Sequence, residues 1–410
     1  MKTPILLLPL LILYVAAVLW VPPSIVANAG DEARCIQGAR NLLDGHYSPC
    51  DDVVLPAGPG YPIVLAPFIG LGVPSIVPRL LNALLLVVGI GFFHGTLRLY
   101  VGKRVALLST YLLGLYPPFF KIVPLILTES LAVLLVCGAG FHFCRMHERM
   151  RSRRSYVGDL LAASFLLGCL ILTKVMFAYV VTVLLLLGGG LCFRRTYAFL
   201  RKPVLVPLGA LLLCVPYLAY THSITGKHFY WSTESGRALY WSTSPHAGDM
   251  GQLFQDSRVA GNPALRANHG AFLDGLSGLS KLEQDREYRR QALRNLRQHP
   301  ELFLRNVLHH AGRLLFNYPC PYTPQKASTY FWLLPNVFIV VTFVALMVPG
   351  YLARRRIPSE IRLLLLFALV AFGGHCLVHS EARYLLPLVP ILILAEVFVA
   401  ARTLKVELRA

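Results

Sequence analysis

The sequence predicts an all-α polytopic membrane protein with about ten transmembrane helices. Of its 410 residues 56% are hydrophobic and 14% charged, whereas soluble domains are roughly 45–50% apolar. The mean hydropathy of +0.58 agrees, and many apolar runs reach the ~17–25 residues needed to cross a bilayer. These runs lie near 4–21, 75–97, 104–120, 124–144, 158–174, 175–193, 203–220, 331–352, 361–379 and 384–401.

The basic residues predict the orientation of these spans. The formal net charge is +19, but Lys and Arg form short clusters between apolar runs, and no nucleic-acid-binding motif is present. Such clusters mark cytoplasmic connections. With both termini cytoplasmic, far more basic residues fall inside than outside. We therefore expect two long outer segments, at 22–74 and 221–329, and no nucleic-acid partner.

The expected organisation has three parts. An N-terminal transmembrane module, 1–220, contains the first outer segment, the large outer loop is 221–329, and a C-terminal transmembrane module is 330–410. Residues 1–29 also imitate a secretory signal, with Ala27-Asn28-Ala29 as a cleavage pattern. Their apolar stretch is longer than the usual ~7–15 residues, so we expect a retained span.

The first outer segment predicts a helix on the membrane surface. Pro22-Pro23 end the first span, and "DEARCIQGARNLLDGHY" then has helical periodicity, with Gly45 where a C-terminal cap is expected. One face carries Ile36, Ala39, Leu43 and Tyr47. An amphipathic helix of this kind lies in the interface. After it, "PAGPGYPIVLAPF" predicts an irregular return to the membrane.

The large outer loop has two halves. The near-repeat of Tyr230-Trp231-Ser232-Thr233 at 240–243 predicts a hairpin or paired extended segments. Residues 281–298 and 300–317 predict two basic amphipathic helices, separated at His299-Pro300.

Three carboxylates are candidate catalytic groups because acids are scarce in this chain. Asp31 and Glu32 open the surface helix, where acids also serve as helix caps. The pair would suit a general base, with one carboxylate taking a proton and the other orienting the base or the acceptor. Glu129 lies in the outer part of the fourth span, either as a helix-terminal acid or as the lining of a wet cavity.

Two cations are candidate anion ligands. Lys174 ends the fifth span, and Arg383 precedes the last span near His375, His379 and Glu381. The alternatives are snorkelling for Lys174 and simple pairing with Glu381 for Arg383. As a pair they would form an anion clamp, because a phosphate justifies cations on the outer face against the positive-inside bias.

Most of the nine cysteines lie inside spans, whereas Cys35 and Cys50 lie in the first outer segment. These two could form a disulfide in an oxidising compartment or remain free thiols. No His/Cys cluster has zinc spacing. No cofactor is predicted, and the sequence leaves a divalent metal open.

In their order, these motifs resemble the bacterial GT-C glycosyltransferases of the protein O-mannosyltransferase and aminoarabinose transferase (ArnT-like) group. The resemblance covers nearly the whole chain. It is carried by "GDEARCIQGARNLLDG", "PAGPGYPIVLAPF", "LTESLAVLL", "LTKVMF", "DREYRRQALRNLRQHPELFLRNVLHH" and "EARYLLPLVPILIL". From the sequence we expect fewer spans than the larger members have and no appended soluble domain.

The resemblance implies inverting transfer of a sugar from a polyisoprenyl-phosphate donor at the outer face of the bacterial plasma (inner) membrane. Asp31 matches the catalytic acid and Glu32 the second acid of the family's pair. Glu129 resembles an acidic position at the start of the fourth span. We expect the remaining site residues to be Lys174, Arg383, Tyr384 and His379 at the donor phosphate, with Arg34 and Tyr61 in the substrate loop.

Two other functions stay open at this level. A transporter or flippase of lipid-linked sugars would share the apolar helices and the clamp. A polysaccharide ligase or polymerase would instead use residues of the large loop such as Arg237 and His246. The sequence does not define the sugar or the oligomeric state, and the acceptor could be a glycolipid, a polysaccharide or a protein.

Overall fold

The computed structural model describes residues 3–21, 30–49, 52–324 and 327–403. This part of the chain is helical and contains no β-strand. Its α-helices are α1 (Thr3–Trp20), α2 (Asp31–Leu43), α3 (Gly60–Gly70), α4 (Ile76–Arg98), α5 (Lys103–Gly114), α6 (Pro117–Ile122), α7 (Glu129–Arg151), α8 (Val157–Thr173), α9 (Met176–Cys192), α10 (Leu205–Leu213), α11 (Val215–Thr225), α12 (Ser235–Ser242), α13 (Asp256–Ala260), α14 (Pro263–Asp274), α15 (Lys281–Gln298), α16 (Pro300–Phe316), α17 (Tyr330–Leu352), α18 (Ser359–Val378) and α19 (Val389–Thr403). Short 3₁₀ helices are η2 (Arg195–Leu200), η3 (Ala247–Asp249), η4 (Ala327–Thr329) and η5 (Ala382–Leu385).

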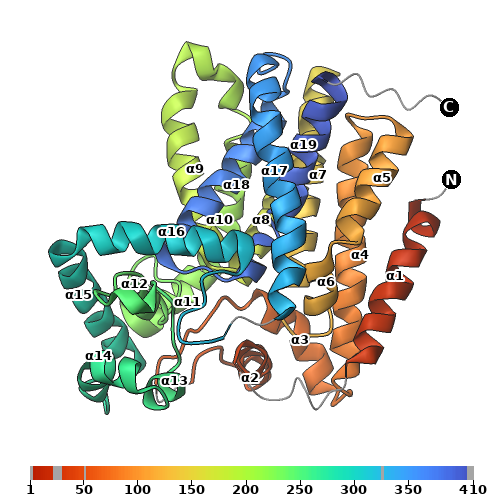
Figure 1. Cartoon of the computed structure of the whole chain (residues 1–410). Coiled ribbons are helices and arrows are strands. Elements are labelled where there is room, and N and C mark those ends of the chain that lie inside the picture. The colour runs from red at the N-terminus through yellow and green to blue at the C-terminus, as the bar shows by residue number, and fades with distance from the viewer. Residues whose placement is uncertain (1–2, 22–29, 50–51, 325–326, 404–410) are drawn as a thin grey trace.

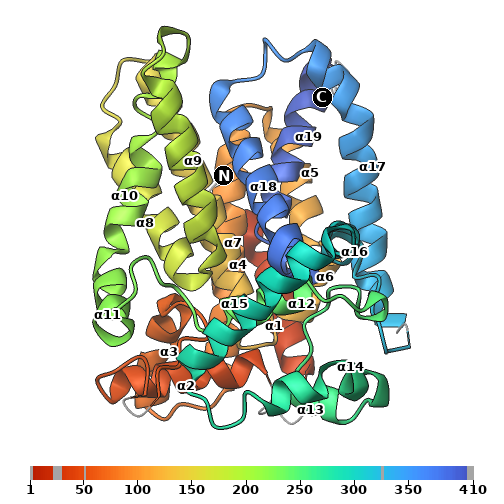
Figure 2. The ribbon, with the colours of Figure 1, turned by 90° about the vertical axis from the view of Figure 1, so that its left-hand side faces the viewer.

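The helices form a bundle with a second layer across one end (Figures 1 and 2). The long helices α4, α7, α17 and α18 run along the bundle axis, whereas α2 and α12 to α16 gather at one end and α16 lies across it. We call this end the α2 end. The described chain finishes with α19 at the opposite end (Figure 1).

Close helix contact in the bundle depends on small residues. A Cβ atom at Gly89 of α4 would lie 2.9 Å from the Cα atom of Leu134 in α7. Only glycine permits this approach. The contact brings the two helices together along apolar faces that are buried throughout the central cluster of the molecule.

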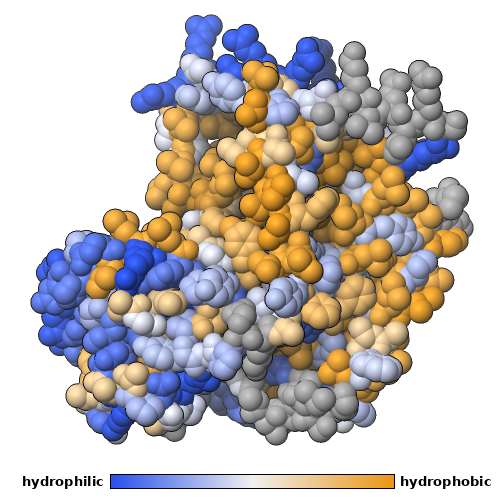
Figure 3. All heavy atoms as spheres, in the orientation of Figure 1, coloured by the Kyte–Doolittle hydropathy of each residue, from blue (hydrophilic) through white to orange (hydrophobic). Residues whose placement is uncertain are grey.

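An apolar belt surrounds the bundle, as expected for a multi-pass membrane protein. Figure 3 shows hydrophobic side chains over the bundle, with hydrophilic side chains over the layer of α13 to α16 and at the opposite tips. On α17 the apolar side chains of Leu334, Val341 and Val348 are largely exposed. Exposed apolar surface on this scale is typical of lipid contact rather than of a soluble surface.

The predicted number of ten full-length spans is not reproduced. By length and composition, α4, α7, α17 and α18 can each cross a membrane, and α10 with α11 can do so as a pair bent by 46°. The predicted span at 104–120 is divided into α5 and α6 before Pro117. The helices α8 and α9 have 17 residues each. At about 1.5 Å per residue they are shorter than a ~30 Å hydrocarbon core.

Contacts between distant segments fix the end of the bundle opposite α2. Arg151, the last residue of α7, contacts Glu360 of α18 through Nη2 and Oε1 at 2.8 Å. The hydroxyl of Tyr100 donates to the same Oε1 at 2.9 Å. The connections that follow α4 and α7 and precede α18 therefore lie together, and the other ends of α7 and α18 meet near α2.

The structure corrects two local expectations at the α2 end. The segment "PAGPGYPIVLAPF" forms helix α3 from Gly60, with Pro62 in its first turn, where proline is tolerated. The second Tyr-Trp-Ser-Thr copy lies in and just after helix α12, so no hairpin forms. The first copy, residues 230–233, contacts the first outer segment instead: the backbone N–H of Thr233 donates to the carbonyl of Leu55 at 2.9 Å.

The two basic helices of the outer layer start and end close to the predicted positions. Helix α15 begins with a capping box in which Ser280 and Glu283 exchange side-chain-to-backbone hydrogen bonds. Helix α16 begins at Pro300, directly after the cap residue His299. Beneath them Asp249 accepts hydrogen bonds from Tyr322 at 2.9 Å and contacts His269 at 2.7 Å. This polar network anchors the small apolar core of the layer.

Two earlier expectations concern residues outside the described ranges. The possible cleavage pattern Ala27-Asn28-Ala29 and Cys50 both lie there. Cys35 is buried on α2 and its thiol is free.

Candidate functional site

Four chain segments that are far apart in the sequence meet at the α2 end. They are the first turn of α2, the first turn of α7, the residue after α8 and the 3₁₀ helix η5. They bring together Asp31, Arg34, Glu129, Lys174 and Arg383, which we call the charge cluster.

Asp31 bridges two cations. One carboxylate oxygen, Oδ2, accepts a hydrogen bond from Nη2 of Arg383. The other, Oδ1, lies 3.3 Å from Nη1 of Arg34, which is one turn further along α2. The Asp31 side chain is 38% exposed, so a substrate can reach it.

Glu129 forms the buried side of the cluster. Its Oε1 accepts a hydrogen bond from Nζ of Lys174 at 3.1 Å and lies 3.8 Å from Nε of Arg383. The side chains of Glu129 and Lys174 are 2% and 12% exposed. Buried charges persist only when paired. Glu129 therefore holds both cations in place from behind.

Aromatic rings form one wall of the cluster. The ring of Tyr384 lies 4.9 Å from Nζ of Lys174 and 5.4 Å from Cζ of Arg383, both within cation–π range. His375 stacks on this ring at a centroid distance of 5.0 Å, and His379 meets it edge-on at 5.8 Å.

The protonation states follow from these surroundings. Burial raises the pKa of Asp31, but the charges of Arg383, Arg34 and Lys174 lower it by a larger amount. The pKa of Asp31 is therefore below its ordinary value. Asp31 is thus ionised at neutral pH. Burial and nearby cationic side chains lower the pKa of His379 to about 3. His379 is therefore neutral and can contribute a hydrogen bond but no charge.

A glycine-containing loop fixes the position of Lys174. A Cβ atom at Gly58 would lie 1.9 Å from the carbonyl oxygen of Leu172, and one at Gly60 would lie 2.5 Å from Oγ1 of Thr173. The segment "PAGPG" thus packs its backbone directly against the last turn of α8. This contact explains the glycines of the motif, because no side chain fits there.

Glu32 and Tyr61 form their hydrogen bonds outside the charge cluster. Glu32 accepts a hydrogen bond from the backbone N–H of Ile126 at 2.6 Å. The ring of Tyr61 is fully buried, and its hydroxyl donates to Asn82 at 2.9 Å. Neither side chain contacts Asp31, Lys174 or Arg383 through a hydrogen bond or an ion pair among the described residues.

The large-loop residues of the polymerase hypothesis have local partners. Nη2 of Arg237 donates to the carbonyl of Phe254 at 2.7 Å and contacts Asp256 at 3.0 Å. His246 packs edge-on against the ring of His269 at 5.0 Å. Among the residues that the structure describes, no group of three His, Cys, Asp or Glu side chains is arranged to hold a metal ion.

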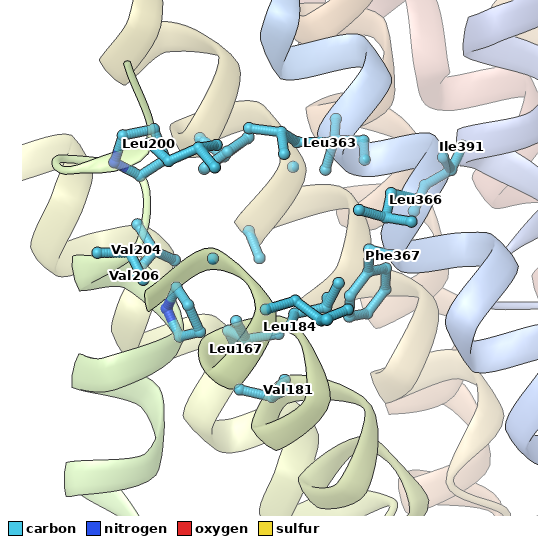
Figure 4. Close-up of a pocket in the computed structure, with 18 of the residues that line it drawn as sticks. Leu167, Val181, Leu184, Leu200, Val204, Val206, Leu363, Leu366, Phe367 and Ile391 are labelled. Carbon is cyan, nitrogen blue, oxygen red and sulfur yellow. The ribbon is translucent and has the colours of Figure 1, made fainter. Parts of the chain in front are cut away.

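An apolar cavity of about 160 Å³ lies within the bundle (Figure 4). Its walls come from α7, α8, α9, α10, α18 and α19 and include Leu167, Val181, Leu184 and Phe367. Leu170, also in the wall, is one helical turn before Lys174. The cavity thus begins close to the charge cluster and extends into the bundle. Apolar cavities of this size stay dry and accept apolar ligands.

Sequence reasoning missed Asn82 and His375. Asn82 is fully buried in α4, where it donates to the carbonyl of Leu125 at 2.6 Å. Its signal was present in "RLLNALLLVV", because an amide inside an apolar span needs a partner. His375 was noted only as a neighbour of Arg383, because its stacking on Tyr384 depends on how α18 meets η5.

Comparisons with known proteins show which family model and which solved folds this chain is similar to. Residues 57–220 match the model of a family described as dolichyl-phosphate-mannose-protein mannosyltransferase. No curated protein matches significantly. One solved structure with a similar fold is the archaeal oligosaccharyltransferase AglB from Archaeoglobus fulgidus in complex with an inhibitory peptide and a dolichol-phosphate. It is 12% identical, with a TM-score of 0.53 and coverage of 97% of this chain and 50% of that chain.

A second structure of an Archaeoglobus fulgidus oligosaccharyltransferase, tethered with an acceptor peptide, is 12% identical, with a TM-score of 0.52 and coverage of 97% of this chain and 49% of that chain. This chain therefore spans about half the length of these proteins. ArnT from Cupriavidus metallidurans bound to undecaprenyl phosphate is 14% identical over 97% of this chain and 77% of that chain, with a TM-score of 0.44.

Proposed function

We propose that this membrane glycosyltransferase of the GT-C type transfers a sugar from a polyisoprenyl-phosphate donor to an acceptor nucleophile, with inversion, at the α2 end. The observation that carries the proposal is the charge cluster. It combines an accessible carboxylate, Asp31, with two cations, Lys174 and Arg383, that converge on one aromatic wall.

The reaction needs a base and a place for the leaving phosphate. Asp31 takes the proton of the acceptor hydroxyl. At the same time the oxygen of that hydroxyl forms a bond to the anomeric carbon. The bond from that carbon to the phosphate oxygen breaks, and the lipid phosphate leaves with the electron pair. Because a phosphate is a fair leaving group, cations rather than a general acid support its departure. The carboxylates also offset the positive charge that develops on the sugar.

The charges of the cluster suit a phosphodiester. Three cations, Arg34, Lys174 and Arg383, face two carboxylates, Asp31 and Glu129, which leaves a net charge of one positive unit. A sugar phosphodiester carries one negative charge. When it shares Lys174 and Arg383, the pull of these cations on Asp31 weakens and the pKa of Asp31 rises. A carboxylate with a higher pKa is a stronger base.

The apolar cavity supports a lipid-linked donor. A phosphate held by Lys174 would have its isoprenoid chain beside Leu170 and Val181, where the cavity begins. A cavity of about 160 Å³ is close to the size that holds one benzene ring, and thus about one isoprene unit. The rest of the chain would lie along the exposed apolar faces of the bundle in the membrane.

We further propose that the α2 end faces the extracytoplasmic side of the bacterial plasma membrane and that both termini are cytoplasmic. The basic residues at and just after the ends of α7 and α17, which include Arg151 and Arg354, support this orientation. The acceptor class is a glycolipid, a polysaccharide or a protein that presents its nucleophile at this face.

The test is Asp31→Asn, which keeps the shape of the side chain and removes the base. Transfer of radiolabelled sugar from polyisoprenyl-phosphate donors to membrane lipid, glycan and protein fractions should fall by about 10²-fold or more. Binding of polyisoprenyl phosphate should persist, because Lys174 and Arg383 remain. Unchanged turnover in the Asp31→Asn protein would falsify the assignment of the base.

A further inference from the structure

A single peptide group between α6 and α7 is held on both sides by side chains from other helices. The backbone N–H of Ile126 donates to Oε1 of Glu32 at 2.6 Å. The carbonyl of Leu125, which belongs to the same peptide group, accepts from Nδ2 of Asn82 at 2.6 Å. The hydroxyl of Tyr61 in turn donates to Oδ1 of Asn82 at 2.9 Å. We call these three side chains the peptide clamp.

The peptide clamp connects the two carboxylates of the charge cluster. Glu32 follows Asp31 directly in the first turn of α2. Ile126 is three residues before Glu129, the first residue of α7. The hydrogen bond from Ile126 to Glu32 therefore ties the segment that carries Glu129 to the turn that carries Asp31.

Burial makes these bonds strong positional constraints. Glu32 is 8% exposed, while Tyr61 and Asn82 are fully buried. A buried polar group that loses its partner pays its desolvation cost, so each group of the clamp favours the one arrangement that satisfies all of them. Arg79, one turn before Asn82 on α4, is also buried and its charge acts on Glu32. Glu32 thus has both a local counter-charge and a fixed backbone partner.

We infer that Glu32, Asn82 and Tyr61 are positioning residues that set the placement of Asp31 relative to Glu129, and that the Glu32 carboxylate does not itself take part in the reaction. This inference rests on the proposed function for its kinetic consequence only. It gives the second acid of the Asp-Glu pair a different task from the first. It also explains why Tyr61 lies behind the site rather than in it.

Two substitutions of Glu32 separate positioning from chemistry. In Glu32→Gln the amide oxygen still accepts the Ile126 N–H, so sugar transfer should stay within about tenfold of the parent. In Glu32→Ala the bond is lost. A misplacement of about 1 Å can lower turnover by about 10²-fold, and we expect a loss of this size in kcat with a much smaller change in the donor KM. The acid limb of the pH profile should be the same in Glu32→Gln and the parent.

Asn82→Ala should reproduce the loss in kcat expected for Glu32→Ala. Tyr61→Phe should give a smaller loss in kcat, because it removes one hydroxyl and keeps the ring. The matched control is Asn336→Ala. Asn336 accepts from the hydroxyl of Tyr116 and donates to the carbonyl of Leu315, so it makes the same kinds of bond away from the charge cluster. Its replacement should leave turnover near that of the parent.

A readout independent of activity is amide hydrogen exchange over 123–128 in the full chain in lipid nanodiscs. Exchange there should be faster by about tenfold in Glu32→Ala and Asn82→Ala, as expected for the loss of one buried hydrogen bond. It should not change in Glu32→Gln or Asn336→Ala. Unchanged exchange in Asn82→Ala overturns the clamp. Equal kinetic losses in Glu32→Gln and Glu32→Ala, with normal exchange in Glu32→Gln, overturn it in favour of a chemical role.

The exchange measurement also separates the two proposals. If the parent chain transfers sugar from no polyisoprenyl-phosphate donor, the proposed function fails, while the exchange pattern still decides whether the clamp exists. If the parent chain is active, the contrast between Glu32→Gln and Glu32→Ala decides the task of Glu32.

Discussion

Gly58→Ala should displace Lys174, the proposed phosphate ligand, without replacing a charged group. The new Cβ atom would lie 1.9 Å from the carbonyl oxygen of Leu172, whereas real Cβ atoms stay at least 3.0 Å from such neighbours. The loop and the end of α8 must therefore separate by roughly 1 Å, because both partners are backbone atoms. Lys174 is only two residues beyond Leu172, so its 3.1 Å contact with Glu129 must change too.

A displacement of this size predicts a loss of about 10²-fold in turnover or in phosphate affinity. Overpacking should also lower the free energy of unfolding by about 1–3 kcal/mol, which leaves the chain folded. The assay is binding of polyisoprenyl phosphate to the full chain in nanodiscs, followed by sugar transfer, with thermal unfolding measured in parallel.

Gly158→Ala is the matched control for this experiment. Gly158 lies in the first turn of the same helix, α8, and an added Cβ there meets nothing within 4 Å. It should leave activity unchanged and stabilise the helix slightly, by about 0.5–1 kcal/mol. The reasoning is refuted if Gly58→Ala binds and turns over donor like Gly158→Ala.

Three further predictions concern charge. Lys174→Ala should weaken binding of polyisoprenyl phosphate by about 10- to 100-fold, the value of a hydrogen bond to a charged group. Equal affinities of the variant and the parent in titration would contradict the anion clamp of Lys174 and Arg383. The pKa of Asp31 is below its ordinary value, so kcat/KM should stay level down to about pH 4. At lower pH it should fall as the base is protonated. An acid limb centred near pH 6 that disappears in Asp31→Asn would contradict this low pKa. Burial raises the pKa of Asp249, but hydrogen bonds from His269 and other side chains lower it to a net value below the ordinary one. Its stabilising effect is thus present above about pH 4 and lost as the pH falls further, so thermal unfolding of Asp249→Asn and of the parent should converge in acid and differ at pH 7.

The charge cluster combines a buried carboxylate and an accessible one that share the same cations. Glu129 is 2% exposed and Asp31 38% exposed. The first pairs permanently with cations in a medium of low polarity, and the second is accessible to an acceptor from the aqueous side. The charges of Lys174 and Arg383 act on both carboxylates, and in the proposed reaction an incoming phosphate would change the basicity of Asp31 without moving Glu129.

Several features of this chain could be predicted from the sequence because they depend on local patterns. Apolar runs gave the membrane class and most helix positions, and basic clusters gave an orientation that remains a prediction. The amphipathic pattern and the break at His299-Pro300 placed α15 and α16 to within a residue. Local signals failed for α3, where a Pro- and Gly-containing segment was expected to be irregular, because the helix there is stabilised by packing rather than by propensity.

The site residues were nominated by chemistry, since an acid or a lysine against an apolar run is costly unless it has a partner. Which partners they have was decided only in three dimensions. Asp31 and Arg383 are 352 positions apart, and no spacing rule connects such residues. Asp31 and Glu32 look alike in the sequence, yet one faces Arg383 and the other a backbone amide. Adjacent residues on a helix point about 100° apart. Only the packing of α2 against α3, and its contacts with η5 and with the segment before α7, determine what each one meets.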